Sequence, residues 1–360
     1  MNTIFPDSTQ FFTGKKAILL LKEFIAKDIQ PDKIFIITDE NANKFCLKPF
    51  KKVLKDFYEI IVLIVAEGEQ NKTLANCENI WWSLAKKGAT RKSLIINLGG
   101  GMISDIGGFV ASTFKRGLKY INIPTTLLAQ VDAAIGGKTA IDFNGVKNLL
   151  GVFSFPEAIL IHPPFIETLS EEQKKSGFAE MVKAGLACDK SFWHQLSELN
   201  FNEITDWQKL INRAVEIKLQ VINADPFETG FRRVLNFGHT IGHAFEAYSL
   251  EYDEKPLLHG EAVAMGMICE TLLSQKKSGL NIEESKSIIE FLLKNFKYYS
   301  VPEEAFTQIL NYIFYDKKNE AGEFKYTLLS SAGRAVTGQS IDSETVVESL
   351  KEYSKVKDNF

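Results

Sequence analysis

The sequence predicts an α/β protein in which a wound, mostly parallel sheet precedes a mainly α-helical domain. Short β-branched runs alternate with helical patterns in the first part of the chain, which is typical of a parallel sheet covered by helices. Beyond Pro163 and Pro164 these runs become rare, and apolar residues recur with a helical period. We therefore expect a first domain over 1–158, a second over 159–360, and one cleft shared by both.

Four segments of the first part are the predicted strands: KIFIITDEN, EIIVLIVAEGE, SLIINLGGG and YINIPTT. They end in Gly, Asp or Thr turns, and ligands of a wound sheet bind at the carboxyl ends of its strands. In the second part, WQKLINRAVEIKLQVINA and AVAMGMICETLLSQKKS predict helices. The late segment EFKYTLLSSAGRAVTG is strand-like and predicts either a return to the first domain or a small local sheet.

Composition excludes several classes of function. A net charge of -3 and 24% charged residues argue against nucleic acid or a membrane as partner, while small anionic substrates remain compatible. The apolar run IIVLIVA is too short to span a membrane. The cysteines, Cys46, Cys77, Cys188 and Cys269, form no C-x-x-C pair, so we expect a cytoplasmic protein without a disulfide framework or thiolate zinc site.

The stretch LIINLGGGMISDIGG places three glycines between a predicted strand and a helix. Such glycines let backbone N–H groups approach a phosphate at a helix N-terminus. Ser104 stands where the dinucleotide fingerprint has its last glycine, so a tight turn remains an alternative to nucleotide binding. Asp105 and the polar turns TDEN and EGEQNK favour binding.

A second glycine-containing stretch, DAAIGGKTAIDFNGVKN, carries Asp132, Lys138, Lys147 and Asn148. Glycines beside lysines place ammonium groups against phosphate oxygens. A solvated surface loop is the alternative interpretation.

The helix predicted for GFAEMVKAGLA carries Glu180 and Lys183 on one face. A surface salt bridge would explain the pair. The apolar neighbours instead favour burial, and a buried carboxylate needs a metal or a cation.

Two of the five histidines, His239 and His243, lie four residues apart in NFGHTIGHAFE, and His259 opens LLHGEAVAMGM. The H-E-x-x-H pattern of zinc proteases does not apply, because HTIGH has no acid between its histidines. His239 and His259 each follow a turn at a helix start, where the helix dipole favours a neutral ring suited to coordination. With Glu180 they would form a site of two histidines and one carboxylate, the ligand set of an open catalytic zinc. The alternative is that these are structural histidines.

Together these stretches resemble the 3-dehydroquinate synthase family. The resemblance runs through TDEN, EGEQNK, GGGMISDIGGFVAS, FKRGLKYINIPTTLLAQVDAAIGGKTAID, GVKN, GFAEMVK, RRVLNFGHTIGHAFE, LHGEAVAMGM and DKKN in family order. It implies a Rossmann-like N-terminal domain, a helical C-terminal domain, and an active site in the cleft.

The resemblance also implies roles for individual residues. It implies a divalent metal, zinc or cobalt, on Glu180, His239 and His259, with His243 reserved for catalysis and proton relay. It implies NAD binding by Asp39, Asn41, Glu69, Lys72, Gly100, Gly101, Met102, Asp105, Thr125, Thr126, Asp132, Lys138, Lys147, Phe165 and Thr168. It implies substrate contacts from Arg116, Asn148, Lys183, Lys218, Arg232, Asn236 and one of Lys317 or Lys318.

The implied reaction is a lyase reaction of the shikimate pathway, which leads to chorismate and the aromatic amino acids. A small anionic sugar phosphate, 3-deoxy-D-arabino-heptulosonate 7-phosphate, would become 3-dehydroquinate through transient oxidation by NAD, loss of phosphate, re-reduction and aldol closure. A homodimer is the family expectation.

Three other functions are compatible with parts of these motifs. A related sugar-phosphate cyclase making a cyclitol would not need Lys218, Arg232 and Asn236 for a substrate carboxylate. A metal-dependent polyol dehydrogenase would release NADH, and a non-catalytic NAD- or metal-binding regulator leaves the assembled lysines unexplained.

Departures from the family pattern are few. Lys175 stands where an arginine is common, and Ala133 and Ala134 stand where serines are common. The segment EYDEKPLLHG before His259 is also longer than usual.

Overall fold

The computed structural model describes residues 9–14, 16–54, 58–144, 146–316 and 325–359, and it divides into two compact units. The first unit spans 1–170 and the second spans 171–360. The sequence placed this boundary after residue 158. The first unit extends further because β8 (Ala158–Ile161) is hydrogen-bonded into its sheet, between β1 and β5.

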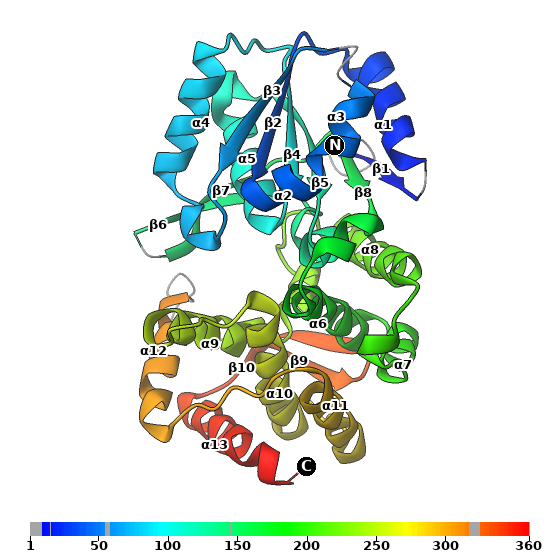
Figure 1. Cartoon of the computed structure of the whole chain (residues 1–360). Helices are drawn as coiled ribbons and strands as arrows, with labels where there is room; N and C mark the ends of the chain where they lie inside the picture. The colour runs from blue at the N-terminus through cyan, green and yellow to red at the C-terminus, as the bar shows by residue number, and fades with distance from the viewer. Residues whose placement is uncertain (1–8, 15, 55–57, 145, 317–324, 360) are drawn as a thin grey trace. The chain divides into compact units, whose positions relative to one another are not determined.

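A six-stranded, all-parallel sheet forms the centre of the first unit (Figure 1). Its spatial order is β1 (Gln10–Thr13), β8, β5 (Lys119–Pro124), β4 (Leu94–Gly99), β2 (Ile34–Asp39) and β3 (Ile60–Val65). The four predicted strands are therefore β2 to β5. The two strands on the β1 side of the sheet were not predicted; both are only four residues long.

Alternate residues of the central strands face opposite layers of helices. Ile34 and Ile36 of β2 pack with α1 (Ala17–Phe24) and α3 (Leu47–Leu54). Phe35 and Ile37 pack with α4 (Leu74–Lys86) and α5 (Gly101–Thr113) on the other face (Figure 1). A parallel sheet covered on both faces favours strands that are mainly apolar, which is why these runs do not alternate in polarity. Asn97 of β4 and Asn122 of β5 are buried exceptions that hydrogen-bond to each other.

Shorter elements complete the first unit. They are η1 (Ile25–Ile29), α2 (Glu40–Phe45), η2 (Glu69–Asn71), η3 (Phe114–Arg116), η4 (Ala129–Ala133), the antiparallel hairpin of β6 (Lys138–Phe143) and β7 (Val146–Phe153), and η5 (Pro163–Thr168).

The second unit is mainly helical, as predicted. Its helices are α6 (Glu171–Cys188), α7 (Lys190–Ser197), α8 (Trp207–Ala224), α9 (His239–Tyr252), α10 (His259–Lys277), α11 (Ile282–Asn295), α12 (Phe306–Asp316) and α13 (Ser343–Asn359), with the short η6 (Phe201–Glu203), η7 (Phe231–Asn236) and η8 (Glu303–Ala305). Helix α10 is central, because it packs against α6, α9, α11 and α13.

The late strand-like segment forms a local hairpin of β9 (Lys325–Ser331) and β10 (Arg334–Ser340) within the second unit. This selects the second of the two predicted possibilities. Within the described part of the chain, no helix combines the length and apolarity needed to cross a membrane.

Candidate active site

Residues predicted to bind NAD stand at the carboxyl ends of three central strands of the first unit, at the same edge of the sheet. Asp39 ends β2, Gly100 follows β4, and Thr125 follows β5. Because these strands are parallel, their carboxyl ends share one edge, where ligands of such sheets bind. Asp39 also caps α2, since its Oδ1 accepts a hydrogen bond of 2.7 Å from the N–H of Ala42.

The glycine after β4 is not needed for an unusual backbone conformation, since Gly100 has a negative φ of -75°. It is needed because the chain packs closely around it. A Cβ at Gly100 would lie 3.1 Å from Cγ2 of Thr126, and one at Gly101 would lie 3.1 Å from Cβ of Ala133. The bare backbone therefore fits between two neighbouring loops at the N-terminus of α5, where the helix dipole favours an anion. The N-terminus of α5 suits a dinucleotide phosphate, while close packing within the chain accounts for the two glycines.

Lys72 gathers several predicted residues around one ammonium group. Its side chain is 3% exposed. Its Nζ donates to Oδ1 of Asn148 at 2.7 Å and pairs with Asp105 at 3.3 Å, Asp142 at 3.7 Å, and Glu69. Asp142 in turn accepts the backbone N–H of Asn148 at 2.8 Å, which holds Asn148 at its positive φ of 54°.

This arrangement shifts the pKa values of its members. Burial raises the pKa of Asp105 to about 7, with Glu69 and Asp142 adding to the shift and Lys72 opposing it. Burial alone would lower the pKa of Lys72, but Asp105, Glu69 and Asp142 raise it overall. The cluster therefore combines a fixed cation with a carboxyl group that titrates near neutral pH.

The other predicted residues of the first unit are distributed around these elements. Asn41 donates to Glu67, Thr126 accepts the N–H of Ala129 at 3.2 Å, and Thr168 donates to the carbonyl of Phe165 at 3.1 Å. Met102 lies in α5, Asp132 in η4, Lys138 in β6 and Lys147 in β7.

Arg116 does not lie near the other predicted residues of the first unit. It follows α5 and precedes β5, so it lies at the opposite edge of the sheet from the residues after β2, β4 and β5. The structure therefore does not bring Arg116 together with them.

In the second unit, three helices place an acid and two histidines around one point. Glu180 lies in α6 and is 2% exposed, His239 is the first residue of α9, and His259 is the first residue of α10. Oε1 of Glu180 lies 3.7 Å from Nε2 of His239 and 3.5 Å from Nε2 of His259. This Oε1 is buried and accepts no hydrogen bond among the described residues.

Hydrogen bonds on the far side of each ring determine which nitrogen faces Glu180. Nδ1 of His239 donates to the carbonyl of Phe237 at 3.2 Å, and Nδ1 of His259 contacts Oε2 of Glu246 at 3.3 Å. A neutral ring anchored through Nδ1 presents the lone pair of Nε2, which is how ligating histidines are oriented. The donor set and its buried, unsatisfied oxygen fit a divalent metal ion.

His243 lies close to the same point. Its ring centroid is 5.2 Å from that of His239 and 5.8 Å from that of His259. Ring nitrogens of the three histidines lie within 4.8 Å of one another, so proximity alone does not separate ligand from proton carrier. The non-ligating role of His243 stays a prediction.

The electrostatics of this cluster differ in part from the sequence-based expectation. Burial, together with Lys183, holds the pKa of His239 well below its usual value, so this ring is neutral as predicted. Burial alone would lower the pKa of His259, but Glu246 and Glu180 raise it to about 10. His259 is therefore protonated rather than neutral as expected, because the two carboxylates outweigh the effect of burial on its pKa.

Glu180 itself is ionised. Burial raises its pKa, but Lys183 and the two histidines overcome this and hold it well below the usual value. Lys183, also buried, forms the ion pair with Glu180 that their spacing predicted.

Two further predicted residues, Arg232 and Asn236, lie in the segment before α9. Asp225 accepts hydrogen bonds from the backbone N–H groups of Thr229, Gly230 and Arg232 at 2.8 to 3.0 Å, which lower its pKa to about 2 despite burial. The same loop brings Arg232 within 3.9 Å of Glu228, which also accepts from Asn236 at 3.0 Å.

Lys218 is buried in α8, which packs against η7, the element that contains Arg232 and Asn236. Lys317 and Lys318 lie outside the described residues.

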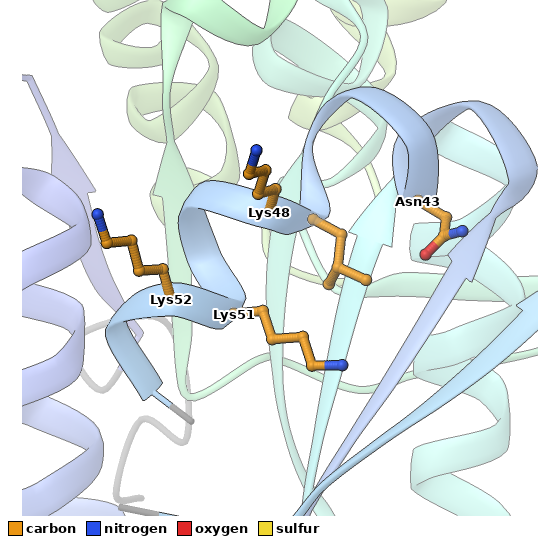
Figure 2. A pocket seen from close by; sticks show the side chains of 5 residues that line it. Asn43, Lys48, Lys51 and Lys52 are labelled. Carbon is orange, nitrogen blue, oxygen red and sulfur yellow. The ribbon is translucent and has the colours of Figure 1, made fainter. Parts of the chain in front are cut away.

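A pocket elsewhere in the first unit does not involve these residues. It is lined by Asn43, Leu47, Lys48, Lys51 and Lys52 at α2 and α3. Figure 2 shows the ammonium groups of its three lysines pointing in different directions, so they do not converge on one ligand. None of the residues predicted for the site lines it.

Several carboxylates in these clusters were not predicted, among them Asp142, Glu228 and Glu246. Asp142 organises Asn148, Glu228 contacts Arg232 and Asn236, and Glu246 anchors His259. The sequence could have indicated Glu246, because it lies seven residues after His239 on the same face of one helix. Asp142 in β6 and Glu228 in the loop after α8 reach their partners through tertiary geometry that spacing does not reveal.

Two family models match consecutive parts of the chain. The model described as 3-dehydroquinate synthase N-terminal matches residues 62–176, and the one described as 3-dehydroquinate synthase C-terminal matches 177–319. Among curated proteins, a 3-dehydroquinate synthase from Parabacteroides distasonis is 38% identical, covering 92% of this chain and 94% of its own length. One from Clostridium beijerinckii is 40% identical, covering 86% of this chain and 89% of its own length.

Solved structures share the fold at lower identity. A 2-deoxy-scyllo-inosose synthase complexed with carbaglucose-6-phosphate, NAD⁺ and Co²⁺ gives a TM-score of 0.81 at 24% identity, covering 95% of this chain and 96% of that one. A 2-epi-5-epi-valiolone synthase from Streptomyces hygroscopicus, with NAD⁺ and Zn²⁺ bound, gives 0.81 at 22% identity and covers 99% of both chains.

The pKa values of the histidine cluster predict proton release on metal binding. Glu180 is ionised and His239 is neutral at pH 8, whereas His259, with a pKa of about 10, is protonated and must lose its proton to coordinate. We expect about one proton released per Zn²⁺ bound at pH 8, measured by titration calorimetry in buffers of different ionisation enthalpy. Glu246→Gln should release less than the native chain; equal release from both, or none from either, would contradict this electrostatic account.

Proposed function

The chain belongs to the 3-dehydroquinate synthase family, and we propose that it converts 3-deoxy-D-arabino-heptulosonate 7-phosphate to 3-dehydroquinate and phosphate, using NAD and one divalent metal ion. The observation that carries this proposal is the convergence of Glu180 with Nε2 of His239 and of His259, in a chain related to these enzymes over most of its length. We assign NAD binding to the first unit, and metal binding with the contacts to the substrate carboxylate to the second.

In the second unit, Glu180, His239 and His259 would hold the metal. When bound, a divalent ion supplies Lewis-acid polarisation of substrate hydroxyl groups. Lys183 keeps Glu180 ionised, and the carbonyl of Phe237 and the carboxylate of Glu246 orient the two rings. These residues prepare the site before substrate arrives.

In the first unit, the glycine segment at the N-terminus of α5 and the residues after β2 and β5 would hold NAD. When bound, NAD supplies reversible hydride acceptance at its nicotinamide ring. Lys72 would fix Asp105 and Glu69 by charge pairing, so that these carboxylates keep one orientation.

Cationic side chains would bind the two anionic ends of the substrate. Arg232 and Lys218 would bind the carboxylate end, for which the planar guanidinium fork is suited, with Asn236 beside them. Nη1 of Arg232 donates to the carbonyl of Pro226 at 2.7 Å, and its Nε lies 3.9 Å from Glu228, so the side chain is oriented in advance. Lys183 would bind the phosphate end, while Asn148, Arg116 and Lys317 or Lys318 remain predictions from the family alone.

A product assay with a matched variant tests this function. We expect phosphate release from the heptulosonate phosphate with no net accumulation of NADH, because the hydride is returned within each turnover. The native chain should prefer this substrate to sedoheptulose 7-phosphate, which lacks the carboxylate.

Arg232→Ala should lower kcat/KM for the carboxylate substrate at least tenfold, since losing one partner of a buried charge pair typically costs about 2–5 kcal/mol. Steady NADH release would instead identify a polyol dehydrogenase, and preference for sedoheptulose 7-phosphate a cyclitol-forming cyclase.

His243 would move a proton at a substrate hydroxyl oxygen rather than bind the metal. It lies one helical turn from His239 on the same face of α9, which suits a neighbouring but separate task. His243→Ala should keep zinc content and NAD affinity while turnover falls by about 10²- to 10⁴-fold.

His239→Ala is the matched control for this division of labour, because it should lose both zinc and turnover. Loss of zinc in His243→Ala, or turnover equal to that of the native chain, would overturn the assignment.

We also propose that two copies of the chain pair through the β6–β7 hairpin. Every residue of β7 is exposed in the single chain, and the hairpin exposes Val146, Leu149, Leu150 and Val152 among other large apolar side chains. Such a patch marks a protein interface. Light scattering should give the mass of two chains for the native protein and of one for Val152→Glu, while Ile282→Glu on α11 should leave the dimer intact. A native monomer would refute the proposal.

We further propose a cytoplasmic location. All four cysteines are free thiols and three are buried, which suits a reducing compartment. Recovery of the chain from an extracytoplasmic fraction alone would contradict this.

A further inference from the structure

Helices α9 and α10, which begin at His239 and His259, have no N-terminal side-chain cap of the usual kind. The N-cap of α9 is Gly238, in the left-handed region at φ 80°, and the N-cap of α10 is Leu258. Neither residue has a side-chain oxygen to accept the N–H groups of the first turn, which normally need a partner when buried. For α9, and in part for α10, the acceptors come from elsewhere in the fold.

For α9, the cap is supplied by Glu270 of α10. This carboxylate is fully buried, and its Oε2 accepts the N–H of Gly238 at 2.6 Å while its Oε1 accepts the N–H of Ile241 at 3.1 Å. These are the N-cap and N3 donors, the same two that a local capping box satisfies. His239 lies between them in the chain, so Glu270 restrains the backbone on both sides of the ligand.

For α10, an additional cap is supplied by Ser176 of α6. Its buried hydroxyl accepts the N–H of Gly260 at 3.0 Å, immediately after His259. Within the turn, Glu261 accepts the N–H of Leu258 at 2.9 Å. The backbone on both sides of His259 is thus hydrogen-bonded, as it is around His239.

Each capping residue shares its helix with another metal ligand. Ser176 precedes Glu180 by one turn on the same face of α6. Glu270 follows His259 on α10 by about three turns, which again returns to the same face. The caps therefore connect the three ligand helices in sequence, from α6 to α10 and from α10 to α9.

Close backbone contacts keep these connections short. A Cβ at Gly260 would lie 2.1 Å from the carbonyl oxygen of Ser176, and one at Gly266 would lie 2.0 Å from the carbonyl oxygen of Gly238. Glycine at both positions lets the helices approach closely enough for the caps to reach. A shift of either helix would therefore lengthen a cap and displace a ligand together.

We propose that Ser176 and Glu270 are positioning residues for the metal site, which set the separation of Glu180, His239 and His259 by capping the ligand helices. This inference rests on the proposed function, since it assumes that these three residues bind the metal. It predicts that removing a cap weakens metal binding even though neither capping residue is itself a ligand.

The test compares Ser176→Ala and Glu270→Gln with the native protein. Each change is small and leaves the ligands in place, and two variants are used so that a failure of one to fold leaves the other informative. We expect Co²⁺ and Zn²⁺ to bind about 10- to 100-fold more weakly, as for other residues that orient ligands. The visible spectrum of bound Co²⁺ should also change, because it reports ligand geometry.

Two controls separate positioning from general stability and from the proposed function. Asn281→Ala removes the side-chain cap of α11, where Asn281 accepts N–H groups of Glu283 and Glu284, and should lower Tm without changing the Co²⁺ affinity or spectrum. His239→Ala should abolish metal binding.

The outcomes are distinct. If His239→Ala loses metal but both capping variants keep native affinity and spectrum, with only Tm lowered, the positioning role is refuted and the proposed metal site stands. If His239→Ala retains native metal affinity, the metal site itself is wrong, and this inference fails with it.

Discussion

The second unit depends on the burial of one charged carboxylate, Glu180. A buried charge is stable only when it is paired, and breaking a buried pair typically costs roughly 3–5 kcal/mol. Lys183 supplies one partner through an ion pair, while the other side of the carboxylate faces two imidazole nitrogens at 3.5 and 3.7 Å. Three helices must therefore meet at this point, and α10 lies between the other two because it carries both a histidine and the cap of α9.

In the first unit, the constraint is where polar groups can lie around an apolar sheet. Its strands are mainly apolar on both faces, with Asn97 and Asn122 as buried polar exceptions, so most polar groups of the candidate site lie at strand ends and in the loops that follow. The ammonium group of Lys72 draws three carboxylates and the side chain of Asn148 into one cluster. Because Asn148 lies in the exposed β6–β7 hairpin, its hydrogen bond from Lys72 joins this hairpin to the same cluster.

Sequence patterns predicted the features that are local. Strands β2 to β5 were recognisable as continuous apolar runs, and α8 by its helical period, whereas the four-residue strands β1 and β8 were too short to stand out. Glu180 and His259 were identified as candidates, but 79 residues separate them, so no spacing rule could show that their side chains meet. The raised pKa of His259 was missed for the same reason, since Glu246 and Glu180 become its neighbours only through tertiary packing.

We propose that two histidines and one carboxylate bind the metal while a third histidine nearby does not. X-ray absorption at the zinc edge of the Zn²⁺-loaded protein tests this directly, because multiple scattering from imidazole rings counts the coordinated histidines. We expect two imidazole nitrogens at about 2.0–2.1 Å with the remaining ligands oxygen, and an unchanged spectrum for His243→Ala. Three coordinated imidazoles in the native protein, falling to two in His243→Ala, would contradict the account.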